Sequence, residues 1–344
     1  MERTKIKDVD IMLPLICNMK CSYCYHNKAI RPQNYIDNLE DKIIPILDKL
    51  ELDDNVLVYL AGGEDMLMQD RLMKCIRKFK KYEREHNVKF YYKITANGTK
   101  AEDLVNYIDN GLYLPQNVNI SYDGKDSDRT YIDINTLTPL LKYKDKINIR
   151  VSLSNKSIYH LYNTINEVSD FGFKCIEYYF LYENDGYTDD NIVSKFKEEL
   201  DKIMPLQLEN KIILYNYLYA KEKKKEFDKT GTFKKGMFCY DIKKVNILAD
   251  GNFTPCANIS NYMINTDKYT YNENSTIEEI EEGYTLLKNF YSKPHCNSNK
   301  CGNYQCRECS LYATQHRDVH QQCKMRNVEK EIFEKYMKLE HFIK

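Results

Sequence analysis

Three features are missing from this sequence: tryptophan, an excess of either charge, and long apolar runs. Lysine plus arginine equals aspartate plus glutamate at 51 each, so the formal net charge is zero. The basic excess that attracts nucleic acid is absent, and we expect no nucleic-acid partner. No apolar segment reaches membrane-spanning length, and the charged residues 1–7 are not followed by a signal-type apolar region. We therefore expect a cytoplasmic protein with no membrane partner.

Cysteine, in contrast, is plentiful. The 30 tyrosines are spread evenly and indicate a biased composition, whereas the 12 cysteines are unevenly placed. In a cytoplasmic chain, cysteines in this number indicate metal or redox chemistry rather than structural disulfides. Ten of them fall in two groups, and we expect the isolated Cys75 and Cys175 to be core residues.

The first group is Cys17, Cys21 and Cys24, spaced C-x3-C-x2-C directly after the apolar Leu15-Ile16. A loop this short cannot pair three cysteines among themselves, so a metal is the leading explanation. Zinc needs four closed ligands, whereas an iron–sulfur cluster accepts three thiolates and leaves one iron open. Only His26 could complete a zinc site locally. The pattern favours an iron–sulfur cluster, with zinc and unrelated buried cysteines as alternatives.

Strand and helix patterns alternate through the first two thirds of the chain. Six such units in succession predict a parallel sheet with right-handed crossovers. We predict an α/β fold with a partial (β/α)6 TIM-like barrel, and an open doubly wound sheet is the alternative. The expected strands are 8–13, 56–60, 88–95, 117–122, 147–153 and 175–182, and the expected helices are 35–50, 69–86, 101–110, 134–142, 157–171 and 190–203.

Polar and glycine-rich motifs follow several of these strands. Sites in α/β folds form at the carboxyl ends of the strands. Gly62-Gly63-Glu64 follows the second strand, and its glycines permit close backbone approach to a ligand. Asn97-Gly98 follows the third strand, and Ser121-x-Asp123-Gly124 follows the fourth. Arg150, on the fifth strand, has a guanidinium suited to bidentate pairing with a carboxylate.

The cysteine loop, with the aromatic Tyr23 inside it, resembles the cluster loop of radical S-adenosylmethionine (SAM) enzymes. The resemblance implies that Cys17, Cys21 and Cys24 hold a [4Fe–4S] cluster that binds SAM and cleaves it to methionine and a 5′-deoxyadenosyl radical. Asp65 stands where the family usually has proline. The SAM-contacting residues implied by the resemblance are Tyr23, Gly62, Gly63, Glu64, Asn97, Ser121, Asp123 and Arg150.

A second cysteine group lies beyond residue 205, where a β-hairpin is expected over 245–256. The hairpin and the seven cysteines resemble the SPASM extension of radical SAM enzymes, although the later spacing, C-x4-C-x4-C-x2-C, departs from the usual C-x2-C-x5-C-x3-C. The resemblance implies two auxiliary [4Fe–4S] clusters, with a zinc site or a single-cluster extension as alternatives. The first would use Cys239, Cys256 and Cys309, and the second Cys296, Cys301, Cys306 and Cys323.

These patterns divide the chain into a barrel over 1–205 and an auxiliary-cluster domain over 206–344. The closing helix, 327–342, is expected to pack over the second domain. The resemblance implies an oxidoreductase that abstracts hydrogen from a ribosomally synthesised peptide during its maturation, forming a cross-link, a thioether, a dehydrogenated residue or an epimer. The alternatives are a small-molecule dehydrogenase and a binding or electron-transfer module without SAM chemistry.

Partners follow from the same resemblance. The stretch ahead of Cys17 is too short for a winged-helix recognition domain, so we expect the leader of a peptide substrate to bind a separate protein or the barrel itself. An electron donor such as flavodoxin or ferredoxin is also expected.

Overall fold

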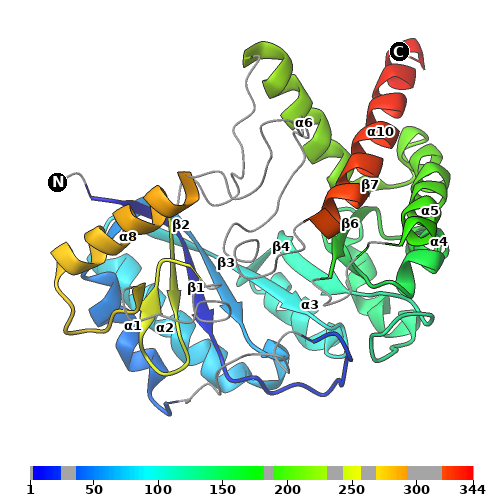
Figure 1. Cartoon of the computed structure of the whole chain (residues 1–344). Coiled ribbons are helices and arrows are strands. Elements are labelled where there is room, and N and C mark those ends of the chain that lie inside the picture. The colour runs from blue at the N-terminus through cyan, green and yellow to red at the C-terminus, as the bar shows by residue number, and fades with distance from the viewer. Residues whose placement is uncertain are drawn as a thin grey trace.

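The computed structural model describes residues 3–24, 36–181, 187, 189–230, 243–256, 269–292 and 320–343 (Figure 1). No helix in these ranges is both long and apolar enough to cross a bilayer. The elements in chain order are β1 (Lys5–Met12), α1 (Leu39–Leu47), β2 (Glu51–Ala61), η2 (Asp65–Leu67), α2 (Gln69–Glu85), β3 (Lys89–Ala96), α3 (Ala101–Asp109), β4 (Tyr113–Ser121), η3 (Ile134–Tyr143), β5 (Asn148–Leu153), η4 (Ser157–His160), α4 (Leu161–Phe171), β6 (Cys175–Phe180), α5 (Asp190–Leu208), β7 (Ile213–Leu214), α6 (Tyr215–Thr230), β8 (Lys244–Ile247), β9 (Phe253–Thr254), α8 (Ile277–Ser292) and α10 (His320–Ile343).

The strands form one sheet in the order β7-β6-β5-β4-β3-β2-β1-β8-β9. All neighbours pair in parallel except β8 and β9, which form an antiparallel hairpin. Strands β1 to β7 lie side by side in chain order, without the reversal that marks a doubly wound sheet. The predicted α/β class, the parallel sheet and the hairpin are thus confirmed.

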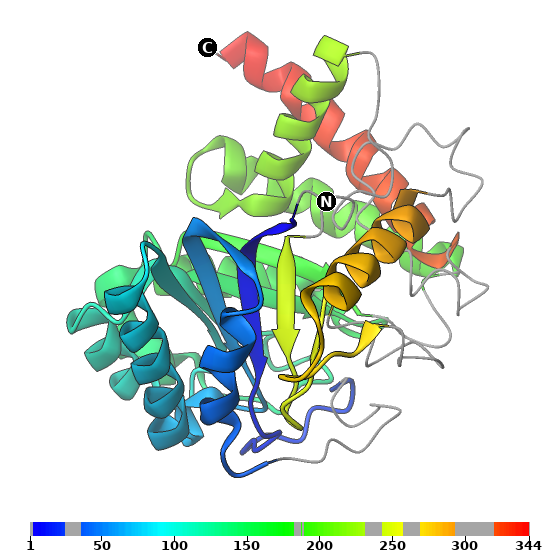
Figure 2. The same ribbon diagram turned by 90° about the vertical axis from the view of Figure 1, so that its left-hand side faces the viewer.

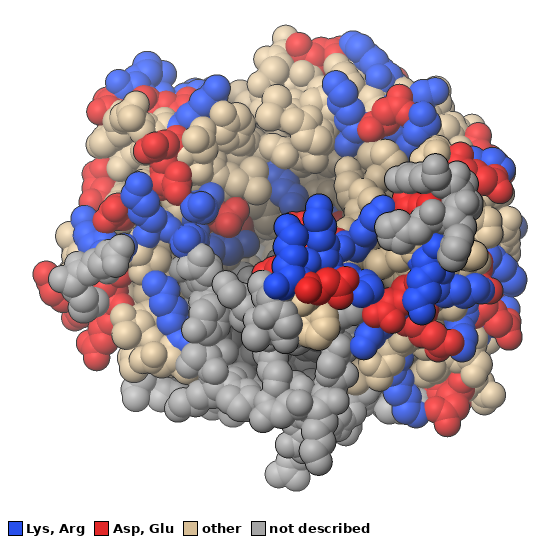
Figure 3. Space-filling view, turned by 90° about the horizontal axis from the view of Figure 1, so that it is seen from above, with Lys and Arg blue, Asp and Glu red and all other residues tan. Residues whose placement is uncertain are grey.

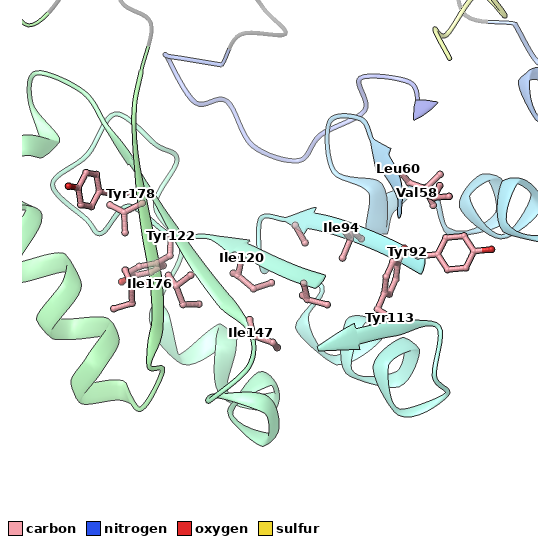
Figure 4. Close-up of a cluster of buried hydrophobic side chains, with 14 of the residues drawn as sticks. Val58, Leu60, Tyr92, Ile94, Tyr113, Ile120, Tyr122, Ile147, Ile176 and Tyr178 are labelled. Atoms are coloured by element: carbon pink, nitrogen blue, oxygen red, sulfur yellow. The ribbon is translucent and has the colours of Figure 1, made fainter. Parts of the chain in front are cut away.

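Side chains alternate between the two faces of the sheet, as the strand pleat requires. On the face covered by helices, apolar side chains such as Val58, Leu60, Ile94, Ile120 and Ile176 are fully buried and form the core (Figure 4). The opposite face, here called the inner face, is polar. Its residues include Asp8, Asp10, Tyr59, Lys93, Thr95, Asn119, Arg150, Glu177, Lys244 and Asn246.

The segment 134–142 differs from its prediction as an α-helix, because the structure forms the 3-10 helix η3 there. Pro139 lies inside it. Proline has no N–H to donate to the preceding turn, which weakens an α-helical arrangement at this position.

The sheet continues past residue 205. Strand β7 adds to β6, and Asp8 to Ile11 of β1 pair in parallel with Lys244 to Ile247 of β8 (Figure 2). The hairpin predicted for the second domain therefore extends the sheet of the first.

The closing helix follows expectation only in part. Within the described residues, α10 packs on α6, which lies in the predicted second domain, and more extensively on α5, which belongs to the predicted barrel. Its Glu329, 2% exposed, accepts hydrogen bonds from the Tyr178 hydroxyl of β6 (2.6 Å) and from Arg326 (2.8 Å). The Arg326 guanidinium in turn lies 4.7 Å from the centre of the Phe180 ring. Buried polar contacts with β6 thus join the apolar side chains of α10 in fixing the position of this helix.

Candidate active site

The cysteine loop leaves β1 and rests on the glycine turn that follows β2. The Leu13 amide donates to the Ala61 carbonyl (2.6 Å), and the Glu64 amide donates to the Ile16 carbonyl (2.7 Å). A Cβ atom on Gly63 would stand 2.3 Å from the Ile16 oxygen, and one on Gly62 would stand 2.9 Å from the Pro14 oxygen. Only glycine allows the two backbones to approach this closely.

The three cysteine side chains of this loop form no disulfide with any described residue. Cys17 is exposed, and Cys21 and Cys24 are half-exposed. The Met19 amide donates to the Cys17 sulfur (3.4 Å), and the Cys24 amide donates to the Cys21 carbonyl (3.1 Å). Across the described part of the chain, no three Cys, His, Asp or Glu side chains stand together as a metal site. Three accessible thiols on one short loop nevertheless fit a [4Fe–4S] cluster, provided that they converge when it binds.

Asn97 joins the loops that follow β1, β2 and β3. Its backbone amide donates to the Glu64 carboxylate (2.6 Å), and its side-chain amide donates to Asn18 (2.8 Å) and lies 4.0 Å from the Cys17 sulfur. Asn18 also donates to the Thr99 hydroxyl (2.9 Å). The residues predicted from motifs on separate strands are therefore brought together beside Cys17.

A buried polar group links the cysteine loop to β4 and β5. The Tyr23 hydroxyl donates to the Asp123 carboxylate, which also accepts from the Ser152 amide (2.8 Å). Arg129 donates to the Tyr23 oxygen (3.2 Å) and contacts the Met19 sulfur (3.7 Å). Burial raises the pKa of Asp123, although the Arg129 guanidinium opposes this effect. Burial likewise raises the pKa of Tyr23, and Asp123 raises it further.

Arg129 was missed by the sequence analysis, as was the segment around it. The Lys20 amide donates to the Thr130 hydroxyl (2.8 Å), and the Ser22 amide donates to the Asp128 carbonyl (3.2 Å). The motif that ends at Gly124 gave no sign that residues 128–130, a few positions later, contact the cysteine loop. The only sequence feature that could have indicated this contact is that these residues follow a predicted strand, because the loops after the strands of an α/β fold lie close together.

Ser121 and Arg150 lie deeper, on the inner face, and pair with each other in register between β4 and β5. The Arg150 guanidinium is 3.6 Å from the Glu177 carboxylate and 4.7 Å from the centre of the Tyr179 ring. Its charge is therefore partly compensated inside the protein. Contact between these two side chains and SAM stays a prediction.

Two neighbouring carboxyl groups lie buried behind the glycine turn. Glu64 is 1% exposed and Asp65 is 2% exposed. One oxygen of each, Glu64 Oε1 and Asp65 Oδ1, has no hydrogen-bond partner among the residues that the structure describes. Burial raises the pKa of Glu64, and it raises the pKa of Asp65 well above its usual value, with the Glu64 charge adding to the effect.

The auxiliary cysteines are only partly described. Cys256 is half-buried just after β9, and Cys323 is half-exposed on α10. Cys75 and Cys175 are buried, as predicted for core residues. The remaining predicted ligands lie outside the described residues: Cys239, Cys296, Cys301, Cys306 and Cys309.

A parallel α/β sheet with a three-cysteine loop after its first strand and a diglycine turn after its second defines a class of iron–sulfur enzyme. The family model of the radical SAM superfamily matches residues 11–192. The chain belongs to this superfamily. It is therefore an enzyme, and its cofactors are SAM and a [4Fe–4S] cluster.

Solved structures share the fold. The structure of anSMEcpe with bound AdoMet and Cp18Cys peptide matches with a TM-score of 0.70 at 19% identity, covering 98% of this chain and 100% of that one. Streptococcus suis SuiB bound to precursor peptide SuiA matches with a TM-score of 0.53 at 15% identity, covering 90% of this chain and 71% of that one.

A relative by sequence is a Methanocaldococcus jannaschii protein named as a glycyl-radical enzyme activating enzyme. It is 26% identical over 155 residues, which are 43% of this chain and 55% of that protein. The chain thus spans about half the length of this curated relative.

Proposed function

We propose that this enzyme cleaves SAM reductively and uses the 5′-deoxyadenosyl radical to abstract hydrogen from a ribosomally synthesised peptide. The observation that carries the proposal is the docking of the Cys17–Cys24 loop onto the diglycine turn at the carboxyl edge of the sheet. The likeness in fold to solved structures that contain AdoMet or a peptide supports it. In this proposal the first 205 residues form a partial (β/α)6 barrel.

In this proposal Cys17, Cys21 and Cys24 hold the cluster, which supplies one electron to SAM when bound. The glycine turn keeps the cysteine loop against β2, and its carbonyls can accept from an ammonium group. Asn97 orients Asn18 and Glu64 beside Cys17. Tyr23, held by Asp123 and Arg129, fixes the second half of the loop. Ser121 and Arg150, which lie deeper on the inner face of the sheet, would offer polar contacts to SAM.

The second part of the proposal concerns residues 206–344, which would carry two auxiliary clusters. Cys239, Cys256 and Cys309 would hold one and leave an iron without a cysteine ligand. Cys296, Cys301, Cys306 and Cys323 would hold the other. Such clusters would receive an electron from the substrate radical, and an external flavodoxin or ferredoxin would reduce the first cluster.

The test is anaerobic incubation of reconstituted enzyme with SAM and dithionite, followed by measurement of 5′-deoxyadenosine. Replacing Cys17, Cys21 and Cys24 together by alanine should abolish this product, because no thiolate remains to hold the first cluster. A matched variant, Cys75→Ala, should retain the product, because Cys75 is a buried core residue on α2. Deoxyadenosine formed at the parent rate by the triple variant would refute the proposal.

A second candidate is activation of a glycyl-radical enzyme, and the name of the M. jannaschii relative favours it. The two candidates differ in product. Peptide maturation leaves a mass change in a peptide, whereas activation leaves a persistent protein-bound glycyl radical. Electron paramagnetic resonance (EPR) of reaction mixtures that contain proteins encoded beside this one, together with peptide mass spectrometry, separates them.

A further inference from the structure

Asp65 is a buried acid beside the diglycine turn, and nothing in the proposed function uses it. Charged side chains of both signs are interspersed over the surface seen from above (Figure 3). Glu64 and Asp65 are instead two adjacent carboxyl groups in the interior. Asp65 also stands where the resemblance to radical SAM enzymes has proline. Its position therefore sets this chain apart within the turn.

The two carboxyl groups have different surroundings. Glu64 accepts a hydrogen bond from the Asn97 amide (2.6 Å), and the Arg129 charge opposes the effect of burial on its pKa. Asp65 Oδ1 has no hydrogen-bond partner among the described residues, and no described cation offsets the burial of this carboxyl. A carboxyl in such surroundings retains its proton, so the charge of the pair belongs on Glu64.

The Asp65 carboxyl packs against the first glycine of the turn. A Cβ atom on Gly62 would stand 2.8 Å from Asp65 Oδ1, 2.9 Å from the Pro14 carbonyl oxygen and 3.1 Å from the Leu13 Cβ atom. Asp65 and the start of the cysteine loop thus share the space that a side chain at Gly62 would need. Removing the carboxyl would leave a cavity where the turn and the loop meet.

The backbone around Asp65 has a conformation that proline would impose. Glu64 is extended (φ −134°, ψ 104°), which is the region to which a residue before proline is restricted. Proline would also fix its own φ at the first residue of η2. Aspartate imposes neither restraint. In this chain the conformation must therefore be held by packing, and the carboxyl is the part of Asp65 that lies against Gly62.

We propose that Asp65 is a positioning residue for SAM, whose neutral carboxyl holds the Gly62-Gly63 turn in its binding conformation where a proline ring would otherwise do so. This inference deepens the proposed function and rests on it, because in that function the carbonyls of the turn accept from the ammonium group of SAM. Asp65 itself lies behind the turn and acts on SAM through Gly62.

The test measures the affinity of the reconstituted enzyme for SAM by anaerobic equilibrium dialysis, with the cluster oxidised so that SAM stays intact. Asp65→Ala removes the carboxyl, Asp65→Asn keeps its shape without a charge, and Asp65→Pro replaces the packing by a backbone restraint. Asp70→Ala is the matched control, since Asp70 is exposed on the neighbouring helix α2. Iron content and thermal unfolding check that each variant is loaded and folded.

Asp65→Ala should bind SAM about tenfold more weakly than the parent, because the turn can relax into the cavity. Asp65→Asn, Asp65→Pro and Asp70→Ala should all stay within about twofold of the parent affinity. A role in stability alone would lower the unfolding temperature of Asp65→Ala and leave its affinity for SAM unchanged.

If Asp65→Ala does not fold, Asp65→Glu takes its place, because the extra methylene would displace Gly62 and weaken SAM binding in the same way. Parent-like affinity in whichever of these two variants is used would overturn the inference. So would a loss in both Asp65→Asn and Asp65→Pro as large as that variant's. The proposed function fails separately, if the parent enzyme binds SAM but forms no deoxyadenosine.

Discussion

At Gly63 the backbone of the glycine turn contacts the backbone of the cysteine loop so closely that no side chain fits between them. A substitution at this position therefore tests whether the cysteine loop docks on the turn. In Gly63→Ala the new Cβ would meet the Ile16 carbonyl, so the cysteine loop must move away from β2. Overpacking of this kind typically costs about 1–3 kcal/mol. We expect the variant to lose up to about four of the parent's roughly twelve irons, because misplaced thiolates hold the first cluster poorly.

The control for this change is Gly111→Ala. Gly111, unlike Gly63, has a positive φ (72°), and a Cβ there would meet nothing within 4 Å. The control should lose stability through backbone strain alone and keep its iron. Equal iron content in the two variants would contradict the docking argument.

Asp65 provides a pH-dependent prediction. Its folded-state pKa is raised by burial, so folding favours the protonated carboxyl, and its contribution to stability falls as the pH rises above the ordinary value of about 3.9. Asp65→Asn removes this cost. The variant should be more stable than the parent at about pH 8, by on the order of 1 kcal/mol for each unit of raised pKa, and the gap should shrink toward about pH 5. Urea unfolding across this range measures the gap, and a gap that stays constant would show that Asp65 is not responsible.

Arg129 governs how the segment after β4 holds the cysteine loop. Its cation contacts Tyr23 and Met19. Burial opposes its charge, but Tyr23 and Asp123, with a smaller contribution from Cys21, raise the pKa of Arg129 above its usual value. A cation close to a cluster stabilises its reduced form. Arg129→Gln should therefore lower the reduction potential of the first cluster by about 60 mV, a tenfold change in the one-electron equilibrium.

EPR-monitored redox titration of the reconstituted enzyme measures this shift. Arg129→Lys is the informative control, because lysine keeps the charge but cannot reach Tyr23 and Met19 together. It should keep the reduction potential close to that of the parent. A potential that is the same in the parent and in Arg129→Gln would show that Arg129 only shapes the loop.

Helix α10 is held to β6 by buried polar contacts, so Glu329→Ala should destabilise the fold. The substitution leaves the Tyr178 hydroxyl and the Arg326 guanidinium without this carboxylate in the interior. Breaking a buried pair in this way costs about 3–5 kcal/mol. Glu331→Ala, which removes an exposed pair with Lys197, should cost less than about 1 kcal/mol. Urea unfolding distinguishes the two, and similar losses would contradict this account.

Strands and helices with a strong hydrophobic periodicity could be predicted from the sequence. The neighbouring strands with which they pair often could not. Strands such as β3 and β5 alternate buried apolar with polar residues, so their bounds were predicted to within a few residues. The pairing of β8 with β1 was missed, because alternation within a strand does not specify its neighbour. In the site, Gly62, Gly63 and Asn97 were found from their positions after strands. Arg129 was not, since its role depends on the path of a loop through space.

The metal content of the whole molecule tests both domains at once. Three cubane clusters correspond to roughly twelve irons per chain in the anaerobically reconstituted protein. The variant without Cys17, Cys21 and Cys24 should lose about four of these and keep the spectroscopic signal of the others. Iron and zinc analysis provides the measurement. Four irons with stoichiometric zinc would contradict the auxiliary clusters and leave the first cluster intact.

The parallel pairing of β1 with β8 has a consequence for synthesis on the ribosome. Strand β1 emerges well before Lys244 to Ile247, which pair with its outer edge and follow only after β2 to β7. Until then the nascent sheet presents an unpaired edge, the kind of surface that invites aggregation. Because this contact joins segments so distant in sequence, its closure should be a late step, and it sets the interval during which the growing chain needs protection by chaperones.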